Sequence, residues 1–392
     1  MIGSEFAAEE WARQACPPLA RALAWLLQGL LNVRAARQVC PLWSSRNVPA
    51  FELSVCFLLQ VIAVWKWFNH LSNRPMGSKE ILRLNLDESS ICLFQGAGKG
   101  NVFVARKRRV VQFVTKGKRR ACFTHIAVIC DRSELQPLMP QFLVSNLKAF
   151  PARKMARLRN ACPPNVILVR QRSAWNNRFL CACVIRRIAG SIGHLRDRYQ
   201  PVLLLDASRI HTARVVIAAC VACGIWVVLV PPSLTFLLQP LDTHAFRKYK
   251  HWLRSEFQRA RCEIEQLDLS IEEFLPCVYS AVRFILQGIP WAAAFDENGF
   301  GAKQARVSDA IKRRIGAMPC PRANDACPTD AEITLCFPRG TVVPFDLLRA
   351  QLHPPLVDIP RGMPIFSRSA VAAPRGSPLG RFQGHVRRSA ME

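Results

Sequence analysis

Residues 202–250 decide the fold of this chain and read VLLLDASRIHTARVVIAACVACGIWVVLVPPSLTFLLQPLDTHAFRKYK. The stretch begins with a purely apolar run that ends in Asp206, as a strand buried on both faces does. Gly224 suits the C-terminal cap of a helix, and two prolines stop the apolar run that comes after it. The expected elements are, in order, a buried strand over 202–205, a helix over 212–223, a buried strand over 225–230 and an amphipathic helix over 242–262.

Upstream of this stretch, short strand-like runs are separated by glycine-containing or basic turns, which is typical of an antiparallel meander. The meander is followed by a strand at 166–169 and a helix over 175–189. Together these elements predict an α/β fold, a ribonuclease-H-like mixed sheet flanked by helices. The runs of the meander are 81–86, 91–94, 102–104, 110–114 and 122–130.

The chain divides where its composition changes. The apolar stretches before the linker-like residues 73–78 predict a helical N-terminal segment that could be a degenerate DNA-binding region. The end of the chain is rich in Pro, Arg, Gly and Ser, which predicts a largely disordered basic tail. The expected parts are the N-terminal segment 1–78, the core 79–262, a helical extension of the core 263–310 and the tail 311–392.

The charge balance predicts an anionic partner. The sequence has 54 Lys and Arg against 27 Asp and Glu, a formal net charge of +27, and its pI is about 10.3. DNA is the expected partner, because each phosphate neutralised by Lys or Arg releases condensed counterions. An anionic membrane surface and a generally basic-biased composition are the alternatives. The uncharged run 215–230 is shorter than the roughly 20 residues of a membrane span, so we expect no membrane insertion.

Two basic clusters flank the expected strand 110–114. As a β-ribbon they would place two cationic ends side by side, able to follow phosphates without reading bases. A solvated hairpin or a localisation signal is the alternative interpretation, and either one favours a nuclear protein. The expected DNA-binding residues are Arg106, Lys107, Arg108, Arg109, Lys116, Lys118, Arg119 and Arg120.

Three aspartates end or follow strongly apolar segments: Asp87, Asp206 and Asp242. The carboxyl ends of parallel strands meet at one edge of a sheet, so these side chains are expected to converge. Three carboxylates would suit Mg²⁺ or Mn²⁺, and two such ions could hold the attacking and leaving oxygens of a phosphoryl displacement. The alternative for each aspartate alone is a helix cap or a turn residue.

The neighbourhoods of these aspartates resemble the DDE endonuclease superfamily, in the branch of pogo-like transposases, jerky-like proteins and centromere protein B. The resemblance covers roughly residues 81–260. It implies a ribonuclease-H-like fold, DNA nicking followed by strand transfer, and two ions held by Asp87, Asp206 and Asp242, the first two sharing one ion. A homo-oligomer fits such a protein. The three blocks are LNLDESSI (84–91), LLLDASRIHT (203–212) and VVLVPPSLTFLLQPLDTHAFRKYK (227–250).

The chain also departs from that family. Residues 207–210 replace the usual small residue and polar turn after Asp206, and His244 stands where a glycine is common. Glu88 is set aside because neighbouring strand residues face opposite sides. The apolar residues before Asp87 lack the usual paired helix-turn-helix modules, as in a truncated or degenerate copy. A transposase-derived DNA-binding protein that has lost catalysis is therefore the alternative to an active endonuclease.

Overall fold

The protein is described from a computed structural model, in which residues 48–74, 77–92, 122–147, 150–264, 269–301, 308–309, 311 and 327–352 are placed. All of them belong to a compact unit that spans Met1–His353. Residues 1–47 of the expected helical N-terminal segment, the expected strands at 102–104 and 110–114 and the basic clusters between 106 and 120 lie outside the described residues. The predicted domain boundaries stay predictions.

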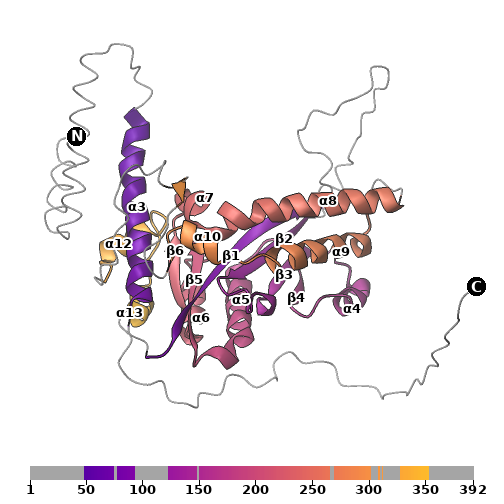
Figure 1. Cartoon of the computed structure of the whole chain (residues 1–392), viewed down its shortest axis with the longest axis horizontal. Helices are drawn as coiled ribbons and strands as arrows, with labels where there is room; N and C mark the ends of the chain where they lie inside the picture. The colour runs from indigo at the N-terminus through magenta and orange to yellow at the C-terminus, as the bar shows by residue number, and fades with distance from the viewer. Residues whose placement is uncertain are drawn as a thin grey trace, which may run out of the picture. The chain divides into compact units, whose positions relative to one another are not determined.

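A six-stranded mixed sheet forms the centre of this unit (Figure 1), with the strand order β4-β3-β2-β1-β5-β6. β2 is antiparallel to both β1 and β3, while β5 and β6 run parallel to β1 and β4 runs parallel to β3. The strands are β1 (Glu80–Cys92), β2 (Cys122–Cys130), β3 (Gln141–Asn146), β4 (Val166–Gln171), β5 (Tyr199–Asp206) and β6 (Trp226–Val230).

This order confirms the predicted fold class. The chain lays down three antiparallel strands, then adds β5 and β6 in parallel on the other side of β1, which is the ribonuclease-H-like arrangement with β4 as an additional edge strand. The two parallel strands are buried throughout their apolar stretches, because helices cover both faces of the sheet there.

The helices lie on both faces of the sheet. In Figure 1, α5 and α6 lie on one side of it, and α8, α9 and α10 lie on the other. α3 packs beside β6 and against α12, and α13 packs against α6. The α-helices are α3 (Val48–Ser72), α4 (Ala152–Asn160), α5 (Arg178–Ser191), α6 (Arg214–Ala222), α7 (Thr235–Leu238), α8 (Phe246–Ile264), α9 (Ile271–Ala281), α10 (Ala292–Glu297), α12 (Asp330–Leu335) and α13 (Phe345–Leu352). No helix of the described residues is long and apolar enough to cross a membrane.

Short helical turns connect several of these elements. Two of them are π-helical, η7 (Leu241–Ala245) before α8 and η8 (Val282–Leu286) after α9. The 3-10 turns are η4 (Gln136–Leu138), η5 (Gly193–Leu195) and η6 (Pro232–Leu234). The predicted helix 242–262 therefore begins as a π turn, and only its continuation from Phe246 is α-helical.

The structure corrects three expectations. The two strands expected at 81–86 and 91–94 are not separate, because β1 pairs with β2 without interruption from Leu84 to Cys92; residues 93 and 94 lie outside the described part of the chain. β3 and α4 occupy a stretch for which no regular structure was expected. The predicted disorder of 311–392 does not hold for 327–352, where a capping box starts α12 and Lys66 Nζ lies 2.8 Å from Glu332 Oε2.

Candidate active site

Asp87, in the middle of β1, and Asp206, at the end of β5, lie at matching positions of neighbouring parallel strands. The last paired positions of β1 and β5 are Asn85 and Leu204, and each aspartate comes two residues later. Side chains two residues apart share a face of the sheet, so Asp87 lies on the face of Asn85. The strand register thus places two of the predicted carboxylates at one edge.

Asp242 reaches the same edge from the turn η7. The backbone N–H of Leu241 donates to Asn85 Oδ1 at 2.8 Å, and Gln239 Nε2 donates to the carbonyl of Leu86 at 3.4 Å. Both bonds are buried, and they hold the LQPLD segment against β1. Asp242, which follows Leu241, is therefore fixed beside Asp87.

Asp87 is buried, and the charges of other carboxylates act on it. Burial raises the pKa of Asp87 well above its usual value, and repulsion from Asp242, Asp206 and Glu88 raises it further. The pKa of Asp242 is also raised, by partial burial, although hydrogen bonds to Thr235 and Asp87 oppose the change. The structure therefore brings the three predicted aspartates together, and their catalytic role stays a prediction.

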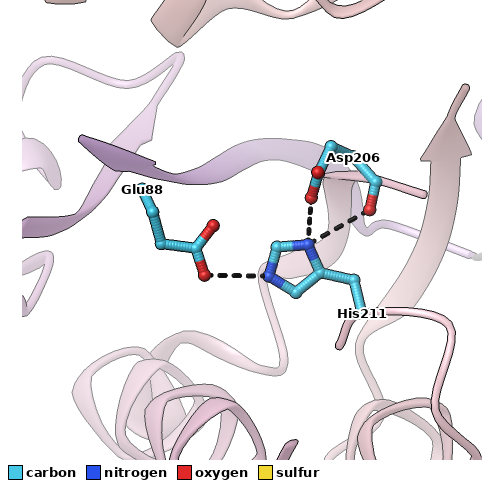
Figure 2. A group of neighbouring side chains, drawn as sticks. All are labelled: Glu88, Asp206 and His211. Carbon is cyan, nitrogen blue, oxygen red and sulfur yellow. Dashed lines mark hydrogen bonds and ion pairs between the residues drawn. The ribbon is translucent and has the colours of Figure 1, made fainter. Parts of the chain in front are cut away.

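On the opposite face of β1, Glu88 takes part in a buried polar chain (Figure 2). His211 Nε2 lies 3.3 Å from Glu88 Oε1, and His211 Nδ1 donates to the side chain of Asp206. His211 Nδ1 also lies 3.1 Å from the backbone oxygen of Asp206. Asn176, at the start of α5, donates from its side-chain nitrogen to Glu88 Oε1. One oxygen of Asp206 is thus held by His211.

The pKa values of His211 and Glu88 in this polar group are shifted in opposite directions. Burial lowers the pKa of His211, but hydrogen bonds to Asp206, Cys181 and Glu88 outweigh it, so the pKa lies well above its usual value. Burial raises the pKa of Glu88, and hydrogen bonds with His211 and Asn176 overcome this and lower it. The raised pKa of His211 favours its protonated form, which donates from Nδ1 to Asp206 and forms an ion pair through Nε2 with Glu88.

One group of the described side chains has ligand atoms close enough together to hold a metal ion. Glu88, Asp206 and His211 offer ligand atoms that all lie within 4.8 Å of one another. In this group, however, the imidazole is already bound to the carboxylates on both sides, and Mg²⁺ and Mn²⁺ prefer oxygen ligands. The metal site expected at Asp87, Asp206 and Asp242 stays a prediction; a cation there would relieve the repulsion that the neighbouring carboxylates exert on Asp87.

The two departures from the family pattern have structural explanations. After β5, the backbone N–H of Ala207 donates to Val230 O at 2.7 Å, and the N–H of Thr212 donates to Ser208 O at 2.9 Å. The altered turn thus still carries His211 back to Asp206. His244 points to Glu297, with 2.8 Å between Nε2 and Oε2. It does not take part in the carboxylate cluster.

Sequence reasoning missed Asn85 and Asn176 and set Glu88 aside. Asn85 could have been noticed as a polar residue between two leucines, in alternation with Asp87 on an apolar strand. Glu88 does lie on the face of β1 opposite to Asp87, as the alternation of strand side chains predicts. The alternation could not show that His211 comes round from the turn after β5 to join Glu88 with Asp206.

Comparisons with known proteins add little to this description. No protein-family model matches the chain, and no curated protein matches it. One solved structure similar to it is a Mos1 transposase paired-end complex with the left transposon end, at a TM-score of 0.32 and 13% identity. The match covers 62% of this chain and 63% of that chain. At this TM-score the similarity carries no argument about function. The strand order defines an α/β, ribonuclease-H-like protein, in which three carboxylates from β1, β5 and η7 interact.

Proposed function

We propose that this chain is a DDE transposase-type endonuclease that cleaves and joins DNA phosphodiester bonds with the help of divalent metal. The observation that carries the proposal is the burial of Asp87 next to three other carboxylates, Asp206, Asp242 and Glu88, on β1, β5 and η7. Such an arrangement costs free energy without a cation, and a structural role does not call for it. It occurs in the three sequence blocks that resemble the superfamily.

The donor set supports Mg²⁺ or Mn²⁺ as the cofactor. Asp87 and Asp206 would hold one ion between them, and Asp242 would complete the site of a second. When bound, the two ions would stabilise both the attacking and the leaving oxygen of an in-line displacement at phosphorus.

The neighbouring residues position these ligands. Asn85 ties the turn before Asp242 to β1 through the N–H of Leu241, so the third carboxylate keeps its place relative to the first. His211 binds one oxygen of Asp206, so the other oxygen would be the one that binds a metal ion. Outer contacts of this kind fix the orientation of metal ligands and tune their affinity.

We also propose that the protein binds DNA and acts in the nucleus. DNA fits the net charge of +27, with the basic residues between 106 and 120 as its expected phosphate contacts. The pogo, jerky and centromere protein B-like branch, a nuclear location and a homo-oligomer are proposed on the sequence blocks and basic clusters alone.

The test is nicking of supercoiled DNA by the full-length protein in Mn²⁺, with EDTA as the metal-free condition. Asp206→Asn keeps the size of the side chain and removes a ligand, so we expect it to abolish nicking. The matched control is Asp197→Asn, an exposed aspartate just before the other end of β5, which should retain activity. Thermal unfolding with and without Mn²⁺ accompanies the assay, because an ion that binds only the folded state raises its melting temperature.

The outcomes separate the two functional hypotheses. Nicking that requires both Mn²⁺ and Asp206 supports the endonuclease. DNA binding without nicking in any variant would instead support a transposase-derived DNA-binding protein. If neither nicking nor a Mn²⁺-dependent rise in melting temperature is found, the metal-site proposal is wrong.

A further inference from the structure

Two large aromatic side chains are exposed at the beginning of α5. Trp175 is 73% exposed and Phe179 is 63% exposed, whereas nearly all other tryptophans of the described residues are buried or half-buried. Single exposed apolar side chains are common on protein surfaces. Three further observations indicate that this pair forms a binding surface: the hydrogen bonds that hold its loop, its place near the candidate active site and the arginines around it.

The support of Trp175 is rigid. Gln171, at the end of β4, donates from Nε2 to the backbone oxygen of Trp175 at 2.5 Å. Asn177 Nδ2 donates to Gln171 Oε1 at 3.1 Å, and Asn177 Oδ1 caps α5 by accepting the N–H groups of Phe179 and Leu180, each at 3.0 Å. The loop that presents the rings is therefore fastened to both the strand and the helix.

The position is next to the candidate active site. Asn176, the neighbour of Trp175, is buried and donates to Glu88, which itself follows Asp87 on β1. Consecutive Cα atoms are only about 3.8 Å apart, so Trp175 lies next to the polar group of Glu88, His211 and Asp206. Asp206 belongs to both this group and the carboxylate cluster, which links the aromatic pair to the candidate active site.

The charge around the rings is positive. Arg172 and Arg178 are exposed, and the Arg178 guanidinium lies 5.0 Å from the centre of the Phe179 ring. The sequence from Arg170 to Ala189 has no acidic residue. Aromatic rings mixed with arginines suit an anionic chain that also presents flat, stackable groups, and a nucleic-acid strand has both properties.

We propose that Trp175, Phe179 and Arg178 form an aromatic platform that binds an unpaired nucleotide of the DNA strand at the active site, with its base stacked on Trp175. The nucleotide must be unpaired, because the bases of an intact duplex already stack on one another. This inference rests on the proposed function, since the strand is the one to be cut. Stacking of this kind tolerates any base.

The test measures binding and needs no cleavage. Full-length protein with Asp206→Asn is titrated in EDTA, at one fixed salt concentration, against a fluorescent single-stranded oligonucleotide and a blunt duplex of equal length. In this background, Trp175→Ala should weaken single-strand binding about tenfold, as loss of one stacked base predicts. It should change duplex binding less than about twofold, because phosphate contacts dominate there.

Two further variants make the result specific. Trp175→Phe keeps a stacking ring and should restore most of the single-strand affinity. Phe284→Ala removes an aromatic ring that is 51% exposed on a different element, η8, and should change neither affinity.

Equal single-strand affinity of Trp175→Ala and its parent overturns the proposal and leaves a protein partner or another segment of this chain as the occupant of the platform. An equal loss on both DNA forms also overturns it, since that result reports general DNA contact. Because the assay needs neither metal nor Asp206, it can succeed where the nicking test fails, and fail where that test succeeds.

Discussion

Lowering the pH should destabilise the packing of α8, the helix that follows Asp242, because one buried histidine of the sheet contacts it. His125 on β2 is fully buried; its Nδ1 lies 2.8 Å from the Tyr249 hydroxyl of α8, and its Nε2 lies 3.1 Å from Gln141 Oε1. Burial lowers the pKa of His125 from 6.5 to about 4. Below pH 6.5 the unfolded chain takes up a proton that the folded chain refuses until about pH 4.

The magnitude follows from that shift. The stabilisation by neutral His125 is complete above pH 6.5 and is lost as the pH falls toward 4, a total of about 3 kcal/mol at 1.36 kcal/mol per pKa unit. Urea unfolding of the wild type and of His125→Gln, each at about pH 7 and about pH 4.5, measures it. The variant cannot be protonated, so its stability should fall by about 2 to 3 kcal/mol less than that of the wild type.

Other groups titrate in both proteins and cancel in this comparison. His251→Gln, which changes an exposed histidine of α8, is the matched control and should follow the wild type at both pH values. If the wild type and His125→Gln lose stability in parallel, then His125 is not the buried neutral group described, and its bond to Tyr249 does not hold α8 in place.

Three other substitutions test the packing around the site. Gly299 has φ +92°, and a Cβ there would lie 2.1 Å from Trp65 Nε1, so Gly299→Ala should cost roughly 3 kcal/mol or more in urea unfolding. Asn85→Ala leaves the buried N–H of Leu241 unpaired, so it should cost about 1–3 kcal/mol and reduce the Mn²⁺-dependent rise in melting temperature. His211→Asn should weaken Mn²⁺ binding about 10- to 100-fold by calorimetry, and an unchanged affinity would contradict its positioning role.

The sequence predicts the parts of this fold whose signal is local. β5 and β6 are continuous apolar runs stopped by Asp206 and by two prolines, and such runs identify buried strands from their composition alone. The same signal places Asp206 at a strand end. The pairing of β5 with β1 then brings it beside Asp87, as the sequence reasoning expected.

The missed features depend on contacts between distant segments. The middle of β1, from Asp87 to Ser89, is polar, so composition suggests a break between two strands. It remains one strand because β2 pairs with it throughout and because distant residues satisfy its side chains: His211 lies beside Glu88, and Asn85, just upstream, bonds to Leu241. No periodicity within β1 encodes these partners.

The polar residues on the Asp87 face of β1 form one continuous assembly. Arg83, four residues before Asp87, binds Asp131 Oδ2 at 2.7 Å through Nε and the carbonyl of Phe300 at 2.6 Å through Nη1. Asn85 then holds Leu241, and Asp87 faces Asp242. The bonds of Arg83 to Phe300 and of Asn85 to Leu241 join β1 to the segment after β6, so the position of the third aspartate depends on buried polar groups as well as on apolar packing. A chain that needed only a stable sheet would be expected to fill these positions with valine or isoleucine. Burying arginine, asparagine and aspartate there is unfavourable, because these groups lose water. In return they fix the relative positions of the three carboxylates.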